Sequence, residues 1–254
     1  MAFEDSRRKI ARAKDHIADL ERHVVAFENC GAYKTVAETD PNFPNKLVHK
    51  IKVIKPLPDV LAVVAGEAAH HLRSALDCAG YEVAVASGKV APKNCMFPFA
   101  RDVDNLKTSL GNAKDIPQEI LAVMCAFQPY KGGDDLLWAL NQIDICDKHK
   151  MLTPVGIAVT RGNTVELKYL ADRDFAIEFP QPPRWDSAKK EIITAITTPI
   201  RNLQLKSEFT LLIAFDDIDV VKGQEAVPVL NALASKVESI VSAIEAEAVR
   251  IGLI

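Results

Sequence analysis

The segment from Val60 to Ala86 constrains the fold more than any other part of the chain. Pro56 and Pro58 precede it and end any earlier strand, and Asp59 stands where a helix cap is expected. Apolar residues then recur at helical spacing, at Leu61, Val64, Ala65, Ala68, Leu72, Ala75, Leu76, Ala79 and Val83. At about 100° per residue they share one face. The segment therefore predicts one long amphipathic helix that must bury this face against other helices.

Three further segments have an apolar stripe of the same kind. They cover about residues 3–28, 134–150 and 227–251, and two shorter helices are expected at about 102–112 and 117–127. The long segments are each amphipathic, so each needs a partner for its apolar stripe. We expect the four long helices, including the one over 59–86, to form an antiparallel bundle.

Between these helices the apolar pattern changes to a period of two, which indicates strands. Residues 33–39 and 47–54 flank a segment rich in turn formers and predict a hairpin. A second hairpin is expected at Arg161-Gly162-Asn163, between strands at 155–160 and 164–170. Further strands are expected at 175–179, 191–197 and 209–215.

Helices and strands do not alternate regularly along the chain, which favours the α+β class. We expect an antiparallel helical bundle packed with a mostly antiparallel sheet. Strands lie mainly in 33–54 and 153–215, and the last helix returns to the bundle. The prediction is therefore a single α+β domain over residues 1–254.

Composition limits the classes of function. The net charge of −3 gives no reason to expect non-specific nucleic-acid binding, and DNA is not an expected partner. The five cysteines are odd in number, widely spaced and without a CxxC pair, which argues against a disulfide framework or a four-cysteine zinc site and fits a reducing cytoplasm. The charged N-terminal residues and the lack of an apolar run of about 18 residues predict a cytoplasmic protein without a membrane span.

Polar side chains of two predicted helices form the candidate site. The helix over 59–86 has a polar face with Glu67, His70, His71, Ser74, Asp77 and Cys78. Arg73 lies at its edge, four residues before Asp77, so the two side chains can pair. The second helix carries Asn141, Asp144, Asp147, Lys148 and His149. We expect these two polar faces to lie opposite each other.

The same stretches resemble a widespread group of uncharacterised bacterial proteins. The motifs are a GEAAHHLRSALD helix from Gly66 to Asp77, Phe97-Pro98, Gln128-Pro129-Tyr130, and an LN…DKHK helix from Leu140 to Lys150. They occur in the same order as in that group. The group carries no activity that can be transferred to this chain.

The helix around Arg73 also resembles HEPN-type helical-bundle proteins, which have an Arg and a His separated by four to six residues. Many HEPN proteins are metal-independent endoribonucleases in RNA-directed or defence systems, and their sites often form at dimer interfaces. The resemblance implies RNA and a second copy of this chain as partners, with Arg73, Asp77, His149 and His70 as catalytic residues. The remaining polar residues of the two faces would bind the RNA: Glu67, His71, Ser74, Cys78, Asn141, Asp144, Asp147 and Lys148. This chain departs from the motif because Cys78 occupies the His position, and a thiol is a poor substitute for imidazole.

Other interpretations need no catalysis. The charges of Arg73, Asp77, Asp144 and Lys148 also suit a structural clamp in a non-enzymatic scaffold or binding protein that works through oligomer contacts. Glu67-x-x-His70 resembles half of a carboxylate-bridged metal site, but no second ExxH is present. We therefore expect neither a metal nor a cofactor, and the sequence leaves both enzyme and scaffold open.

Overall fold

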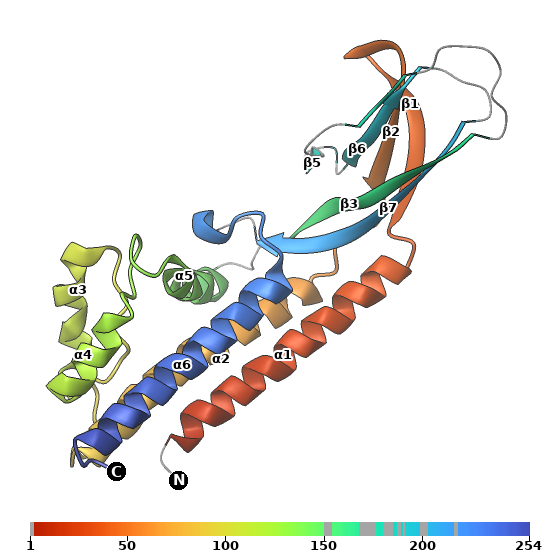
Figure 1. Cartoon of the computed structure of the whole chain (residues 1–254). Helices are drawn as coiled ribbons and strands as arrows, with labels where there is room; N and C mark the ends of the chain where they lie inside the picture. The colour runs from red at the N-terminus through yellow and green to blue at the C-terminus, as the bar shows by residue number, and fades with distance from the viewer. Residues whose placement is uncertain are drawn as a thin grey trace. The chain divides into compact units, whose positions relative to one another are not determined.

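The computed structural model describes residues 3–149, 154–167, 176–179, 185–186, 189, 191–198, 203–215 and 218–254 (Figure 1). The chain divides into two compact units. The helical unit contains Met1–Arg22, Asp59–Thr153 and Phe215–Ile254, and the sheet unit contains His23–Pro58 and Pro154–Ala214. The α+β class is confirmed. The expectation of one domain over 1–254 stays a prediction.

The helical unit is built around α2, from Val60 to Ala86 (Figure 1). The other long helices are α1 (Glu4–Asn29, entering the sheet unit at His23), α5 (Asp135–His149) and α6 (Ala226–Arg250). The short helices are α3 (Val103–Ser109) and α4 (Gln118–Ala126), with 3-10 turns at Leu110–Ala113 and Asp219–Val221. All nine apolar positions predicted for the face of α2 are buried.

Contacts between the long helices fix their directions. Ser6 of α1 bonds Glu82 of α2, whereas His16, further along α1, contacts Glu67 near the start of α2. These contacts run in reverse order, so α1 and α2 are antiparallel. Lys14 of α1 pairs with Glu238 of α6, and Arg7 pairs with Glu245, so α6 is also antiparallel to α1. The predicted bundle of four long helices is thus confirmed, with α2 and α6 parallel to each other.

The sheet unit holds two groups of strands. The larger sheet contains β1 (Tyr33–Asp40), β2 (Phe43–Val53), β4 (Ile177–Glu178), β5 (Trp185–Asp186) and β6 (Glu191–Thr197). All its pairings are antiparallel, in the order β1-β2-β6-β4, and β5 also pairs with β6. The smaller sheet pairs β3 (Pro154–Leu167) with β7 (Leu203–Phe215).

The pairing of β2 with β6 contains a bulge. His49 is opposite Ala195, but the next residue, Lys50, is opposite Ile193. Thr194 is therefore the extra residue, and its hydroxyl donates to the His49 carbonyl at 3.2 Å. That bond compensates for the backbone pairing lost at a bulge.

Two local predictions are wrong. Arg161-Gly162-Asn163 does not form a hairpin turn, because Pro154–Leu167 is one strand of 14 residues. This strand pairs with β7, a strand of similar length. Asp59 makes no side-chain hydrogen bond to the start of α2, since its own backbone is already helical (φ −59°, ψ −27°).

The C-terminal helix α6 is the one described helix that is long and apolar enough to cross a bilayer by length and composition. Many of its apolar residues, among them Leu230, Leu233 and Val237, are buried in the helical unit. A core helix of a bundle passes the same test, so the composition of α6 decides nothing about membranes.

Candidate functional site

The predicted polar faces of α2 and α5 lie opposite each other. Three contacts join the two helices: Gly66 lies against Asp147, His70 bonds Asp144, and Arg73 bonds Asn141. Residue numbers rise along α2 while they fall along α5, so the two helices are antiparallel. A Cβ added at Gly66 would come within 2.1 Å of Asp147 Oδ1, so glycine allows the helices to approach closely here. The sequence therefore identified the correct pair of helices.

Arg73 is almost completely enclosed, with 8% of its surface exposed. Its Nε donates to Asn141 Oδ1 at 3.2 Å, and its Nη1 forms an ion pair with Asp77 Oδ2 at 2.5 Å. The guanidinium also lies 4.5 Å from the centre of the Phe99 ring, a cation–π contact. The Arg73–Asp77 pairing predicted from their spacing is confirmed. Nη1 itself makes no hydrogen bond of good geometry within the described residues.

Asp77 extends this cluster to the segment before α3. Its Oδ1 accepts a hydrogen bond from the backbone N–H of Phe97 at 2.8 Å, while its other oxygen faces Arg73. The Phe97 ring packs beside Phe99, with centres 5.0 Å apart. Asp77 thus links α2 to the Phe97-Pro98 segment and to the aromatic ring that covers Arg73. Together Arg73, Asp77, Asn141 and Phe99 form what we call the Arg73 clamp.

A second polar contact crosses the same seam. His70 Nδ1 lies 2.8 Å from Asp144 Oδ1, and Asp144 is only 2% exposed. The His70 side chain is 46% exposed, and its Nε2 lies 3.4 Å from the Ser74 hydroxyl. Asp144 therefore contacts His70, and Arg73 contacts Asn141 of α5. The predicted clamp of Arg73 and Asp77 with Asp144 and Lys148 stays a prediction, because the side chain of Lys148 lies outside the described residues and Asp144 has further interactions.

A row of imidazoles connects α1 with α2. The His16 and His71 rings are stacked, with centres 5.3 Å apart, and His71 lies 6.0 Å from His70. His16 Nδ1 also lies 3.2 Å from Glu67 Oε2. Burial, followed by the positive charges of Lys9, His16, His70 and Arg12, lowers the pKa of His71. His71 is therefore held neutral at neutral pH, and His16 is a member of this cluster that sequence reasoning missed.

Cys78, at the position of the HEPN histidine, is a free, half-buried thiol. Burial is the largest influence on its pKa and raises it, and Glu82, Asp5 and Asp77 act in the same direction. A thiol with a raised pKa stays protonated at neutral pH and is a weak acid–base group. The side chains of Lys148 and His149 lie outside the described residues, so the roles predicted for them stay predictions. Among the side chains described, no group of histidines, cysteines and carboxylates is arranged to hold a metal ion.

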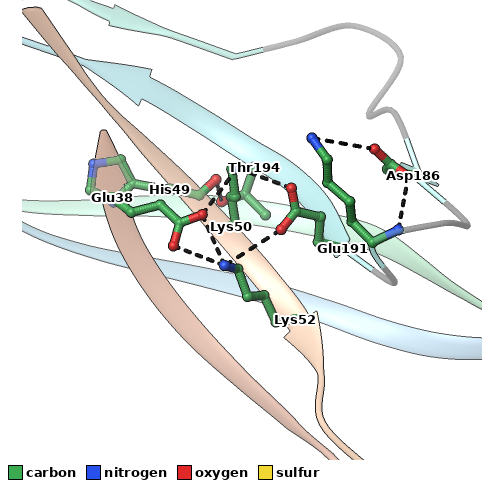
Figure 2. A network of polar contacts seen from close by, with 8 residues as sticks. Glu38, His49, Lys50, Lys52, Asp186, Glu191 and Thr194 are labelled. Atoms are coloured by element: carbon green, nitrogen blue, oxygen red, sulfur yellow. Dashed lines mark hydrogen bonds and ion pairs between the residues drawn. The ribbon is translucent and has the colours of Figure 1, made fainter. Parts of the chain in front are cut away.

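The sheet unit contains a charged cluster that sequence reasoning did not identify. Figure 2 shows Glu38 and Glu191 facing the ammonium groups of Lys50 and Lys52. Lys50 Nζ lies 2.9 Å from Glu191 and 3.1 Å from Glu38, and Lys52 Nζ lies 2.8 Å from Glu38. Lys50 and Glu191 are both buried. The alternation of residues 47–53 suggested a strand but gave no sign that Lys50 is enclosed.

On the other face of this sheet His49 is buried beside Thr197. Its Nε2 lies 3.0 Å from the Thr197 hydroxyl, and burial lowers the pKa of the imidazole. This histidine and the Lys50–Glu191 pair of the charged cluster are buried within the sheet unit. Their geometry suits the holding of strand register rather than contact with a ligand.

Comparisons with known proteins add no relative. No protein-family model matches the chain, and neither a curated protein nor a solved structure matches it.

Proposed function

We propose that this chain is a HEPN-like helical-bundle protein that works by binding rather than by cleaving RNA at Arg73, with Arg73 in a structural role. The observation that supports this proposal is the enclosure of Arg73. With 8% of its surface exposed, and with Asp77, Asn141 and Phe99 around it, the guanidinium has little room for a phosphate. A phosphate-binding arginine needs an open, uncompensated positive charge.

The chemistry at Cys78 supports the same proposal. RNA cleavage by attack of a ribose 2′-OH needs a group that titrates near neutral pH. Burial moves the pKa of Cys78 upward, away from that range. Arg73 and Cys78, the two residues at the motif positions, are thus both poorly suited to the HEPN ribonuclease reaction.

The test is incubation of purified protein with end-labelled RNA, for the unmodified chain, Arg73→Ala and the exposed-site control Arg101→Ala. We expect no cleavage by any of them. Cleavage that is lost in Arg73→Ala and kept in Arg101→Ala would contradict a structural role for Arg73. Circular dichroism of each variant shows whether a loss arises from unfolding.

A second candidate function is RNA-directed, defence-related chemistry at His70. It is favoured by one observation: this exposed imidazole is held by the buried carboxylate of Asp144, as a general base would be. The same RNA assay separates the two candidates. Cleavage that survives in Arg73→Ala and disappears in His70→Gln would support it, and no cleavage by the unmodified chain would exclude it.

The proposed partner is a second copy of this chain in the cytoplasm, with no role for membrane or DNA. Exposed apolar side chains at the C-terminal end of α2, Tyr81 and Val85, support an interface there, with Ile254 beside them. Light scattering on a sizing column should show a dimer, and Tyr81→Lys should reduce it to a monomer. A monomer for the unmodified chain would contradict the homodimer.

A further inference from the structure

Ser74, His70 and Asp144 form a continuous polar relay on the α2–α5 seam. The Ser74 hydroxyl lies 3.4 Å from His70 Nε2, and His70 Nδ1 lies 2.8 Å from Asp144 Oδ1. The carboxylate is at the buried end of the relay, with 3% of its side chain exposed, and the imidazole is at the open end, with 46% exposed. Substrate can therefore reach Ser74 and His70, whereas Asp144 is shielded from bulk water.

The order of the three groups determines the tautomer of the imidazole. An ionised carboxylate only accepts hydrogen bonds, so His70 Nδ1 must carry the proton that faces Asp144. Nε2 of the neutral ring then has its lone pair directed at Ser74, where it can accept the hydroxyl proton. Ser74 follows His70 by four residues on α2, and this spacing places both on one face of the helix.

We propose that Ser74 is the nucleophile of an acyl-transfer site, with His70 as its general base and Asp144 as the positioning residue. The arrangement has the order nucleophile, base and carboxylate that activates serine in hydrolases on unrelated folds. The distance of 3.4 Å is longer than a strong hydrogen bond, as is common for catalytic contacts before substrate binds. The inference uses neither Arg73 nor Cys78 and is independent of the proposed binding function.

The reaction balances within these groups and water. Ser74 Oγ attacks the carbonyl carbon of an ester while its proton passes to His70 Nε2. The C–O bond to the leaving group breaks, and His70 returns the proton to the departing oxygen, which leaves an acyl ester on Ser74. A water molecule, deprotonated by His70, then attacks this ester and releases a carboxylic acid, and Ser74 regains its proton.

The surroundings of Ser74 restrict the substrate class. Ser74 lies in the middle of α2, where backbone N–H groups bond within the helix and cannot stabilise an oxyanion. Without such donors, the site suits esters that need little help to release their alcohol. The expected substrates are activated carboxylic esters, such as aryl esters, rather than amides.

The test uses p-nitrophenyl acetate with the full chain and intact-mass measurement after rapid acid quench. We expect hydrolysis above buffer, with one acetyl group trapped on Ser74 as located by peptide mapping. Ser74→Ala should abolish both. The matched control is Ser235→Ala, since Ser235 is an exposed helical serine whose hydroxyl bonds the Asn231 carbonyl and no imidazole; it should keep the full rate.

The histidine and the carboxylate are tested in the same assay. His70→Gln should lower the rate by roughly a hundredfold or more, the usual contribution of a general base. His23→Gln, at a helical histidine outside the relay, should have no effect. Asp144→Asn should lower kcat while KM stays the same. Active-site titration counts the folded sites, so a mere loss of folded protein would leave kcat per site unchanged. Acetyl found on His70 instead of Ser74, or an unchanged rate in Ser74→Ala, would overturn the proposal.

Discussion

At the scale of single residues, the Arg73 clamp shows how a cation is kept inside a helical bundle. Asp77 neutralises its charge, Asn141 accepts a hydrogen bond from it, and Phe99 covers its plane. Each contact replaces part of the water that Arg73 loses on burial. Removing the guanidinium leaves Asp77 facing a gap, and an ionised group without its partner is costly in a partly buried position.

We predict that Arg73→Ala lowers the free energy of unfolding by about 2 kcal/mol, the usual scale for charge-assisted hydrogen bonds. The expected loss is smaller than for a fully buried ion pair because the Asp77 side chain is 32% exposed. Urea denaturation measures it. Arg73→Lys keeps the charge but lacks the planar guanidinium, so its stability should lie between those of the unmodified chain and Arg73→Ala. The exposed-site control Arg101→Ala should change the free energy of unfolding little. Equal stability of Arg73→Ala and the unmodified chain would remove the argument for a clamp.

Two histidines with lowered pKa values, the buried His49 and the half-buried His71, predict how stability depends on pH. Burial lowers the pKa of both His71 and His49. In the unfolded chain each has a pKa near 6.5. As pH falls below about 6.5 the unfolded state binds protons that the folded state does not, so the free energy of unfolding decreases. We expect urea midpoints to fall between pH 7.5 and 5.

Histidine substitutions identify the source of this decrease. His71→Gln and His49→Gln should each make the loss between pH 7.5 and 5 smaller, because glutamine does not titrate. His23→Gln serves as the control. A pH profile that is identical in all variants would show that other groups cause the loss.

At the scale of elements, close approach at Gly80 controls how α2 meets the segment before α3. A Cβ at Gly80 would lie 2.1 Å from the backbone oxygen of Cys95, so the backbone itself would have to move. We predict that Gly80→Ala destabilises the chain by about 1–3 kcal/mol, as overpacking does, despite the better helix propensity of alanine. Gly111→Ala is the control, since nothing lies within 4 Å of its added Cβ. Thermal melting compares them, and equal stability of the two variants would contradict the close approach.

The charged cluster of the sheet unit leads to a different prediction. Lys50→Met leaves two carboxylates, Glu38 and Glu191, facing the single ammonium of Lys52. We expect it to cost about 3–5 kcal/mol, as for one partner lost from a buried ion pair. Lys50→Met combined with Glu191→Leu removes both charges and should recover most of that loss. Additive destabilisation in urea titrations of the double variant would show that the two residues do not interact.

Regular periodicity made the helices predictable, whereas long-range pairing made parts of the sheet unpredictable. The apolar face of α2 follows from residues a turn apart, and this local rule held at every position. The turn expected at Arg161-Gly162-Asn163 was also a local signal, but β3 continues through it as one strand that pairs with the distant β7. In the candidate site, the Arg73–Asp77 pair was visible from spacing. His16 and Glu191 reach their partners through tertiary structure, and no spacing could reveal them.

At the scale of the whole molecule, the chain offers one tryptophan to report on each unit. Trp138 belongs to the helical unit and Trp185 to the sheet unit. We predict that Trp185→Phe, which leaves Trp138, and Trp138→Phe, which leaves Trp185, report different urea midpoints. Adding Lys50→Met should lower the urea midpoint reported by Trp185 and leave the midpoint reported by Trp138 unchanged. Identical shifts by both probes would instead show that residues 1–254 unfold as one cooperative domain.

The distribution of each unit over distant parts of the chain has a consequence for biosynthesis. On the ribosome α2 emerges long before α6, the helix with which its apolar face finally packs, and β2 emerges long before β6. A nascent chain therefore carries exposed apolar surface and an unpaired strand edge through most of its translation, and such surfaces promote aggregation. Holdase chaperones should accordingly engage this protein while it is still being synthesised, and release it only once α6 has left the exit tunnel.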